Sequence, residues 1–177
     1  MTNRLLCKGD FLEQIEKIAV TKEYMIILRE KDLSADEYMR LAKNVIKICD
    51  KYGADCILHY FIDVCKKLSY KKIHVPLYLL EENPDMINDF DVIGVSVHSA
   101  DEAIKAEKLG ATYITAGHIF ATDCKKGVPP RGIEFLKNVC NSVSIPVYAI
   151  GGIGKSNIDS IKNIADGACQ MSTLMNM

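Results

Sequence analysis

The sequence contains no tryptophan, and phenylalanine and tyrosine together make up only 7% of its 177 residues. It also has almost no net charge, because 22 basic and 23 acidic side chains give −1 at pH 7. A nearly neutral chain has no broad basic field, so neither nucleic acid nor an anionic membrane is an expected partner. No stretch reaches the roughly 18 uninterrupted apolar residues of a membrane span, and the first residues lack the apolar region of a secretion signal.

The seven cysteines are scattered, odd in number and without a CxxC pair, which excludes the framework of a disulfide-rich protein. Most have apolar neighbours, as Cys65 has in Val64, and behave as small core residues. Cys124 is the exception, because it stands between charged residues, and the sequence assigns it no role. With 49% hydrophobic residues and reduced thiols, we expect a single cytoplasmic domain over residues 1–177.

Seven short apolar runs alternate with helical patterns along the chain. The runs are continuous, as is typical of parallel strands covered on both faces, and they span residues 25–28, 56–58, 73–75, 92–97, 113–117, 147–150 and 168–171. Helices are expected over residues 11–18, 35–51, 62–68, 84–88, 100–109, 132–140 and 156–164. The second helix is the best marked, because Ser34 and Glu37 form a capping box and Gly53 ends it.

With a degraded first strand near residues 2–6, the pattern is a βα unit repeated eight times. Strands that alternate with helices predict an α/β fold with a parallel sheet. Eight units predict a compact (β/α)8 TIM barrel with a shortened first strand and no C-terminal helix. A doubly wound open sheet is the alternative, because such a barrel rarely has fewer than about 200 residues.

In either architecture, functional groups gather where strands end. Arg29 and Lys31 directly follow the first clear run, and their spacing in an extended segment would direct both cations toward one anion. The alternative for this pair is a solvated charged turn. Ser96, near the end of the fourth run, is a candidate for hydrogen bonding to a ligand.

The longest predicted βα loop runs from Gly117 to Gly127, and long loops in compact domains are often functional. His118 begins it, and histidine is the side chain best suited to move protons near neutral pH. The alternative is a histidine that only caps a strand end. Thr122 and Lys125 of the same loop are further substrate-binding candidates. The sequence offers no convincing metal-ligand cluster, so neither a metal nor a cofactor is expected.

The segment from Ala149 to Ser156 nearly spells a nucleotide-binding P-loop, but Ala149 replaces its first glycine, and we reject that function. What remains is the pair Gly151-Gly152 at a strand end, whose bare amides suit a phosphate group. In barrels the loops after strands seven and eight form the usual phosphate site. Gly151-Gly152 and Met171-Ser172 follow the two strands in those places.

At these residues the chain resembles the thiamine phosphate synthase superfamily. The resemblance covers nearly the whole length and is carried by the motifs LREKDLS (28–34), GVSVHS (94–99) and AIGGI (149–153). The loop GHIFATDCKKG (117–127), followed by Arg131-Gly132, is closer to the TenI branch, the thiazole tautomerases. The resemblance implies the barrel fold and a small phosphorylated thiazole as substrate.

The synthase branch holds Mg²⁺ and pyrophosphate with two aspartates, whose positions correspond here to Tyr60 and Leu79. The neighbouring asparagine, which binds the pyrimidine, corresponds to His59. Without those carboxylates a pyrophosphate leaving group has no metal to neutralise it. The substitutions therefore speak against the condensation reaction.

The resemblance to the TenI branch instead implies a thiazole tautomerase, an isomerase that aromatises a carboxythiazole phosphate tautomer through proton transfer by His118. Arg29 and Lys31 would hold the substrate carboxylate, while Gly152 and the backbone of Met171-Ser172 would hold the phosphate.

Two alternatives stay open. One is a Mg²⁺-dependent thiamine phosphate synthase, which condenses a pyrimidine pyrophosphate with thiazole phosphate, and the other is a non-catalytic TenI-like regulatory protein. The family normally has a longer first strand and a further helix after the last strand. The resulting open strand edge predicts a homodimer.

Overall fold

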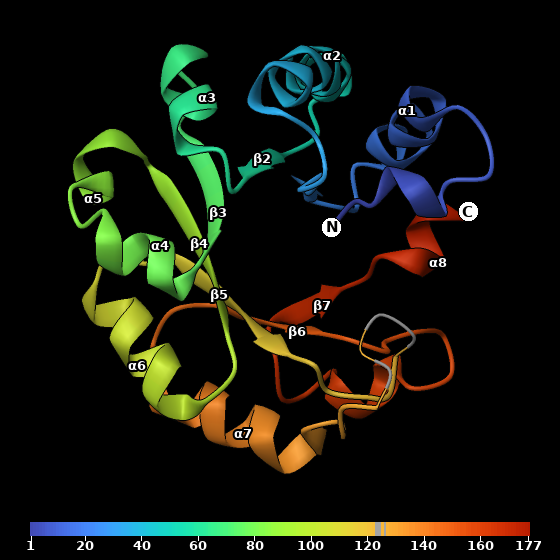
Figure 1. Ribbon diagram of the computed structural model, residues 1–177. Coiled ribbons are helices and arrows are strands. Elements are labelled where there is room, and N and C mark those ends of the chain that lie inside the picture. Colours follow the sequence, from blue (N-terminus) through green and yellow to red (C-terminus); the bar gives the residue numbers. More distant parts are fainter. Residues whose placement is uncertain (123–124, 126) are drawn as a thin grey trace. The chain divides into compact units, whose positions relative to one another are not determined.

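The computed structural model describes residues 1–122, 125 and 127–177 (Figure 1). Two compact units divide the chain, the first comprising Met1–His74 with Met171–Met177 and the second comprising Val75–Gln170. The described residues form seven strands with helices between them, so the predicted α/β class is confirmed. No helix among them is both long and apolar enough to cross a lipid bilayer.

The first unit contains three of these strands, the third of which continues into the second unit. Its elements are η1 (Arg4–Leu6), α1 (Phe11–Thr21), β1 (Ile26–Leu28), α2 (Ala35–Tyr52), β2 (Cys56–His59), α3 (Ile62–Lys67), β3 (Lys72–Pro76) and α8 (Ser172–Met175). Helix α2 begins with the predicted capping box between Ser34 and Glu37, and Gly53 ends it in a left-handed conformation.

Strands β1, β2 and β3 pair in parallel within the first unit. Leu28 lies opposite Leu58, and His59 lies opposite His74. Strands β1 and β2 are buried along their whole length, which explains why their apolar runs are continuous rather than alternating. Because parallel strands end at the same edge, the residues that follow β1 and β2 begin at neighbouring places.

Both ends of the first unit differ from the prediction. Residues 4–6 form the 3₁₀-helix η1 instead of a first strand, because the Asn3 side chain accepts a hydrogen bond from Leu5 N (3.1 Å) and caps the turn. Thr2 keeps one strand-like bond, from its N–H to Ile27 O (2.8 Å). The expected absence of a C-terminal helix is also wrong, because α8 is present as a four-residue helix.

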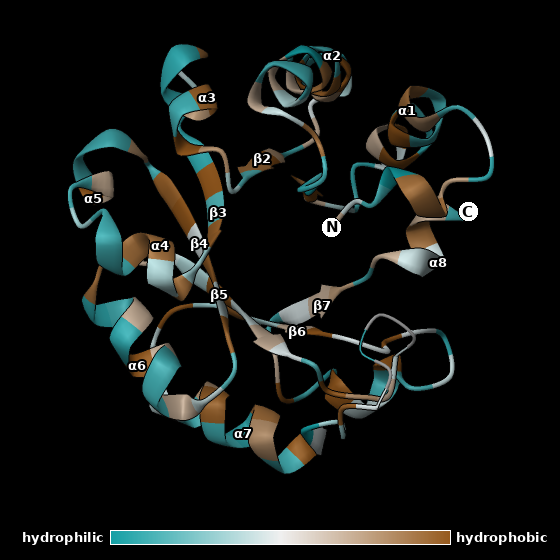
Figure 2. Cartoon of the chain, in the orientation of Figure 1, coloured by the Kyte–Doolittle hydropathy of each residue, from teal (hydrophilic) through white to brown (hydrophobic). Residues whose placement is uncertain are grey.

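The second unit contains the remaining four strands. Its elements are α4 (Leu77–Glu82), α5 (Met86–Asp89), β4 (Val92–Val97), α6 (Ala100–Lys108), β5 (Tyr113–Gly117), α7 (Gly132–Ser142), β6 (Val147–Ile150), η3 (Ile158–Ile161) and β7 (Gly167–Cys169). These strands pair in parallel and in chain order, with Gly117 opposite Ile150 and Ile150 opposite Cys169. Figure 2 shows hydrophobic and hydrophilic residues interspersed along α6 and α7, as helices with one buried face require.

One predicted helix of the second unit is largely absent. Residues 156–164 contain only the short η3. The Asn157 side chain accepts a hydrogen bond from Gly154 N (2.9 Å) and donates one to Gly152 O (2.8 Å), so it holds the backbone in a turn where a helix was expected. The same contacts tie the turn to the glycine pair that follows β6.

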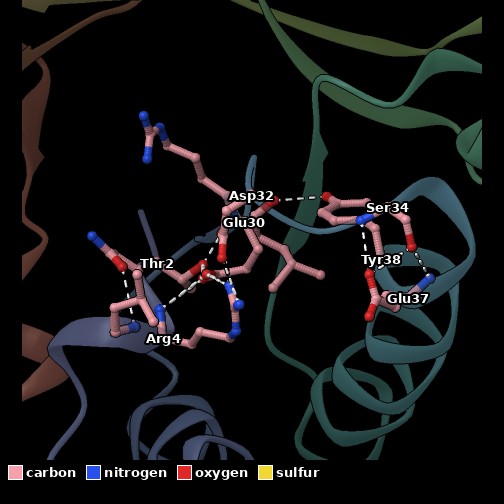
Figure 3. A network of polar contacts seen from close by, with 11 residues as sticks. Thr2, Arg4, Glu30, Asp32, Ser34, Glu37 and Tyr38 are labelled. Atoms are coloured by element: carbon pink, nitrogen blue, oxygen red, sulfur yellow. Dashed lines mark hydrogen bonds and ion pairs between the residues drawn. The ribbon is translucent and has the colours of Figure 1, made fainter.

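A buried carboxylate holds the N-terminal segment against the loop after β1 (Figure 3). Glu30 is 2% exposed, and it accepts hydrogen bonds from Thr2 Oγ1 (2.7 Å), Arg4 N (3.0 Å) and Arg4 Nη1 (3.2 Å). Thr2 Oγ1 in turn accepts a bond from Arg29 N (2.9 Å). Asp32 binds the same guanidinium from the exposed side. We call Thr2, Arg4, Glu30 and Asp32 the Glu30 clamp.

A tyrosine of α2 joins the ends of β1 and β2. The Tyr38 hydroxyl donates to Leu28 O (2.7 Å) and accepts from His59 N (2.8 Å). Its ring is fully buried and lies 4.4 Å from the Phe61 ring, centroid to centroid. Burial raises the pKa of this phenol well above its usual value, so the hydroxyl stays protonated and keeps both bonds.

We predict that Glu30→Ala lowers the free energy of unfolding by about 2–3 kcal/mol, because it leaves the Thr2 hydroxyl and Arg4 without their shared acceptor. Asp32→Ala is the matched control, since it removes an exposed partner of the same arginine, and we expect a change below about 1 kcal/mol. Urea denaturation followed by circular dichroism measures both. Equal losses in the two variants would contradict the role assigned to the buried carboxylate.

We also predict that Tyr38→Phe destabilises the protein by about 2–3 kcal/mol, because it leaves a buried N–H and a buried carbonyl without their partner. Tyr24→Phe is the control, since the Tyr24 hydroxyl makes no hydrogen bond to any described residue, and it should change stability by less than about 0.5 kcal/mol. Thermal and urea unfolding provide the comparison. A Tyr38→Phe protein as stable as the parent would show that the bridge carries little of the stability.

Candidate functional site

The predicted site residues fall in both units. The first unit holds Arg29, Lys31, Met171 and Ser172, and the second holds Ser96, His118, Thr122, Lys125, Gly151 and Gly152. Cys124 lies outside the described residues.

Arg29 and Lys31 follow β1 directly, on either side of Glu30. The Glu30 clamp holds this part of the loop in place. The pKa of Lys31 is lowered, first by partial burial of its ammonium group and then by repulsion from the Arg29 charge. Lys31 Nζ also lies 5.1 Å from the centre of the Tyr60 ring, a cation–π arrangement that holds the ammonium at the end of β2. The two cations therefore lie close enough to repel each other, which is the arrangement that an anion would stabilise.

Two buried histidines lie in neighbouring strands, His59 at the end of β2 and His74 in the middle of β3, and neither was among the predicted site residues. His59 is 3% exposed and His74 is fully buried, and their rings stack with centroids 5.6 Å apart. Burial is the main reason why the pKa of His74 falls to about 3 and that of His59 falls well below its usual value. Both imidazoles are therefore neutral near pH 7, and each has one ring nitrogen that accepts and one that donates.

His59 Nδ1 has no hydrogen-bond partner among the described residues, although it is buried. The next residue, Tyr60, adopts a left-handed backbone conformation (φ 75°), and its ring stacks against His59 at 6.3 Å. Non-glycine residues in this conformation are uncommon and cluster at binding sites. A signal for this group was present in the sequence, because one histidine directly follows the run 56–58 and another lies within the next run, 73–75.

Met171 and Ser172 begin α8 in the first unit. Met175 N donates to Met171 O (3.0 Å), and the Asn176 side chain donates to Ser172 O (2.9 Å). Ser172 is exposed. Met171 and Ser172 follow the last strand along the chain, as predicted. The hydrogen bonds from Met175 and Asn176 engage their carbonyl groups, which do not bind phosphate.

The glycine pair after β6 forms a tight turn in the second unit. Gly151 and Gly152 have φ angles of 101° and 66°, a region that side chains disfavour. A Cβ atom on Gly151 would lie 2.3 Å from His118 Cβ, and one on Gly152 would lie 2.4 Å from Ala121 O. Both positions therefore require glycine, and the turn carries no side chain that could cover its backbone amides.

His118 packs beneath this turn. Its side chain is 4% exposed, its Nε2 atom lies 3.3 Å from Val128 O, and its buried Nδ1 has no hydrogen-bond partner among the described residues. The backbone on either side is tied to neighbouring segments, since Ile119 N donates to Ile150 O (3.0 Å) and Arg131 N donates to His118 O (3.0 Å). The structure thus brings together His118 and Gly151, two residues that the sequence placed in separate motifs.

The remaining candidates lie elsewhere in the second unit. Ser96 Oγ accepts a bond from Thr115 Oγ1 (3.2 Å) and lines a cavity of about 400 Å³ with Pro76, Leu77, Tyr78, Glu81, His98, Asp101, Glu102 and Lys105. Three carboxylates make this cavity a poor phosphate site. Thr122 O accepts from Lys125 N (3.1 Å), and Lys125 is exposed. Among the described residues, no three histidine, cysteine or acidic side chains are grouped to hold a metal ion.

Comparisons with known proteins agree over almost the whole chain. The family model described as thiamine monophosphate synthase matches residues 1–174. A thiamine-phosphate synthase of Clostridium tetani is 33% identical, over 99% of this chain and 86% of the relative. A putative thiamine-phosphate synthase 2 of Aquifex aeolicus is 35% identical, over 99% of this chain and 95% of the relative.

Solved structures give the same result for the fold. A thiamine phosphate pyrophosphorylase from Pyrococcus furiosus matches with a TM-score of 0.86 and 29% identity, over 98% of this chain and 84% of that chain. A nitroalkane oxidase from Streptomyces ansochromogenes matches with a TM-score of 0.71 at 14% identity, over 92% of this chain and 61% of that chain. The second likeness concerns the fold alone.

These findings correct the predicted activity. Relatives that match almost the full length of the chain, in Clostridium tetani and Fusobacterium nucleatum, are named thiamine-phosphate synthases, which are transferases. The expectation of a thiazole tautomerase, and with it of an isomerase, is therefore wrong. It rested on one loop, residues 117–127, and on the missing aspartates at Tyr60 and Leu79, whereas the similarity to the synthases extends over the whole sequence. The predicted superfamily is confirmed, and the chain belongs to the thiamine monophosphate synthase family.

Proposed function

We propose that the protein is a thiamine-phosphate synthase, a transferase that joins a pyrimidine, supplied as its pyrophosphate, to a thiazole phosphate. The observation that carries this proposal is the 33% identity to a thiamine-phosphate synthase over 99% of the chain and 86% of the relative. The likeness to the Pyrococcus furiosus pyrophosphorylase supports it. The reaction releases pyrophosphate, so the protein has to bind two anionic groups, the diphosphate of one substrate and the phosphate of the other.

For the thiazole phosphate we propose the glycine turn of the second unit. Its support is the backbone at Gly151-Gly152, which carries no side chains and where Gly152 is exposed, because backbone amides without side chains can approach a phosphate oxygen closely. His118 supports this turn from below, and we assign it to shaping the site. We assign Ser96, Thr122 and Lys125 to substrate contacts in the same unit. Met171 and Ser172, which belong to the first unit, stay predictions as substrate-binding residues. The closed eight-stranded barrel and the homodimer stay predictions.

The residues present do not fit the metal that the family resemblance implies. Its two aspartates correspond to Tyr60, after β2, and Leu79, in α4, and neither side chain offers a carboxylate. Mg²⁺ prefers hard oxygen ligands in an octahedral arrangement. Arg29 and Lys31 are the charged groups of the first unit that follow β1 instead, and we assign them to the diphosphate.

The proposed activity predicts that the purified chain forms thiamine phosphate from the pyrimidine pyrophosphate and thiazole phosphate. Product formation is followed by chromatography, with pyrophosphate release measured in parallel to check the stoichiometry. A reaction without protein gives the background. Absence of coupling by a folded, pyrophosphate-binding protein would overturn the proposed function.

We further predict that Gly152→Ala raises the KM for thiazole phosphate by about tenfold or more, because the added methyl group meets the Ala121 carbonyl and strains a left-handed backbone. Gly154→Ala is the matched control in the same loop, since a Cβ there meets no atom within 4 Å. Steady-state kinetics of both variants decide the question. An unchanged KM of the folded Gly152→Ala variant would contradict the assignment of the phosphate to this turn.

A further inference from the structure

Five residues of the first unit combine positive charge with buried imidazole groups. Arg29 and Lys31 follow β1, His59 and Tyr60 lie at the end of β2, and His74 lies in β3 opposite His59. The rings of Tyr60, His59 and His74 stack in that order with similar tilt, 17° between neighbours, and Lys31 Nζ lies over the Tyr60 ring. We call these residues the cation–histidine cluster.

Within the described part of the chain, the positive charges of this cluster have no close carboxylate partner. The two acidic residues of the same loop both bind Arg4, and the Asp32 charge also attracts Arg29 without forming an ion pair with it. Neither Arg29 nor Lys31 forms an ion pair with a described residue. Partial burial lowers the pKa of Lys31, and the nearby Arg29 charge lowers it further. Two neighbouring cations without an ion-pair partner favour a bound anion.

The His59 imidazole supplies a hydrogen-bonding atom that the described residues leave unused. His59 Nδ1 is buried without a partner, and buried polar atoms of this kind are rare unless a ligand or ordered water satisfies them. Burial keeps both rings neutral, helped for His59 by His74, Lys31, Arg29 and the N-terminal amine, and for His74 by the N-terminal amine and Lys31. A neutral imidazole can hydrogen-bond a phosphate oxygen or a heterocycle without adding charge.

The same residues are poor ligands for Mg²⁺. A cation pair repels a second cation, and Tyr60 stands where the family resemblance places a carboxylate. The described residues contain no group of three metal-binding side chains. The charge of the diphosphate would therefore have to be neutralised by positive side chains instead of a bound metal ion.

We propose that the cation–histidine cluster binds the diphosphate group of the pyrimidine substrate directly, on Arg29, Lys31 and the His59 imidazole, without a divalent metal ion. This inference rests on the proposed function, because it names how one substrate of that reaction is held. His59 and His74 are thereby assigned to substrate binding, His59 as a contact and His74 as the residue that positions its ring.

Isothermal titration of the full chain with inorganic pyrophosphate tests the proposal, first in excess EDTA and then in excess Mg²⁺. We expect binding in EDTA, with a Kd that Mg²⁺ changes by less than about threefold. Binding that appears only with Mg²⁺ would overturn the proposal.

Variants locate the site. Lys31→Gln and Arg29→Gln should each weaken pyrophosphate binding by about tenfold or more, whereas Lys47→Gln, which removes an exposed lysine of α2, should bind like the parent. His59→Phe should weaken binding, and His59→Gln, which restores hydrogen-bonding atoms, should recover part of the affinity if the imidazole is a contact. Equal affinity of Lys31→Gln and Lys47→Gln would overturn the assignment.

The two proposals fail separately. Pyrophosphate binding in EDTA without thiamine phosphate formation would uphold this inference and overturn the proposed function. Coupling that is abolished by EDTA, together with Mg²⁺-dependent pyrophosphate binding, would uphold the function and overturn the inference.

Discussion

The carboxylate of Glu30 is the interaction on which the organisation of the first unit depends. A buried carboxylate is unfavourable unless hydrogen bonds and an opposite charge compensate it, and Thr2 and Arg4 provide both. In doing so they fix the loop after β1 from inside, so that Arg29 and Lys31 on either side of Glu30 are carried by a rigid backbone. The N-terminal residues are thus part of the machinery that positions these cations.

Tyr38 holds the ends of two strands together, as Glu30 holds the loop after β1 in place. Its hydroxyl connects the last residue of β1 with the last residue of β2, and helix α2 carries it there because the capping box at Ser34 sets where that helix begins. A local sequence signal therefore determines a distant contact. His59 is held at its backbone by this bond, while its ring remains available.

The strands and the longer helices could be predicted from sequence because continuous apolar runs and capping residues act locally. Helix α2 is the clearest case. The 3₁₀-helix at residues 4–6 and the turn after β6 could not be predicted, because each depends on one asparagine side chain that competes with regular backbone pairing.

At the site, Gly151 and His118 were found as separate motifs, but their contact needs the register of β5 and β6. The pairing of His59 with His74 likewise follows from the register of β2 and β3, which no short motif specifies. The activity was misjudged because one loop and the substitutions at Tyr60 and Leu79 were weighted above similarity spread along the chain.

The position of Lys31 over the Tyr60 ring has a practical consequence in a chain that has no tryptophan. Tyrosine absorbance and emission are unobscured in such a protein, and a charge above a phenol ring alters both. Drawing the ammonium toward an incoming anion would change the environment of Tyr60, so the ultraviolet difference spectrum becomes an internal, label-free reporter of occupancy at the end of β2.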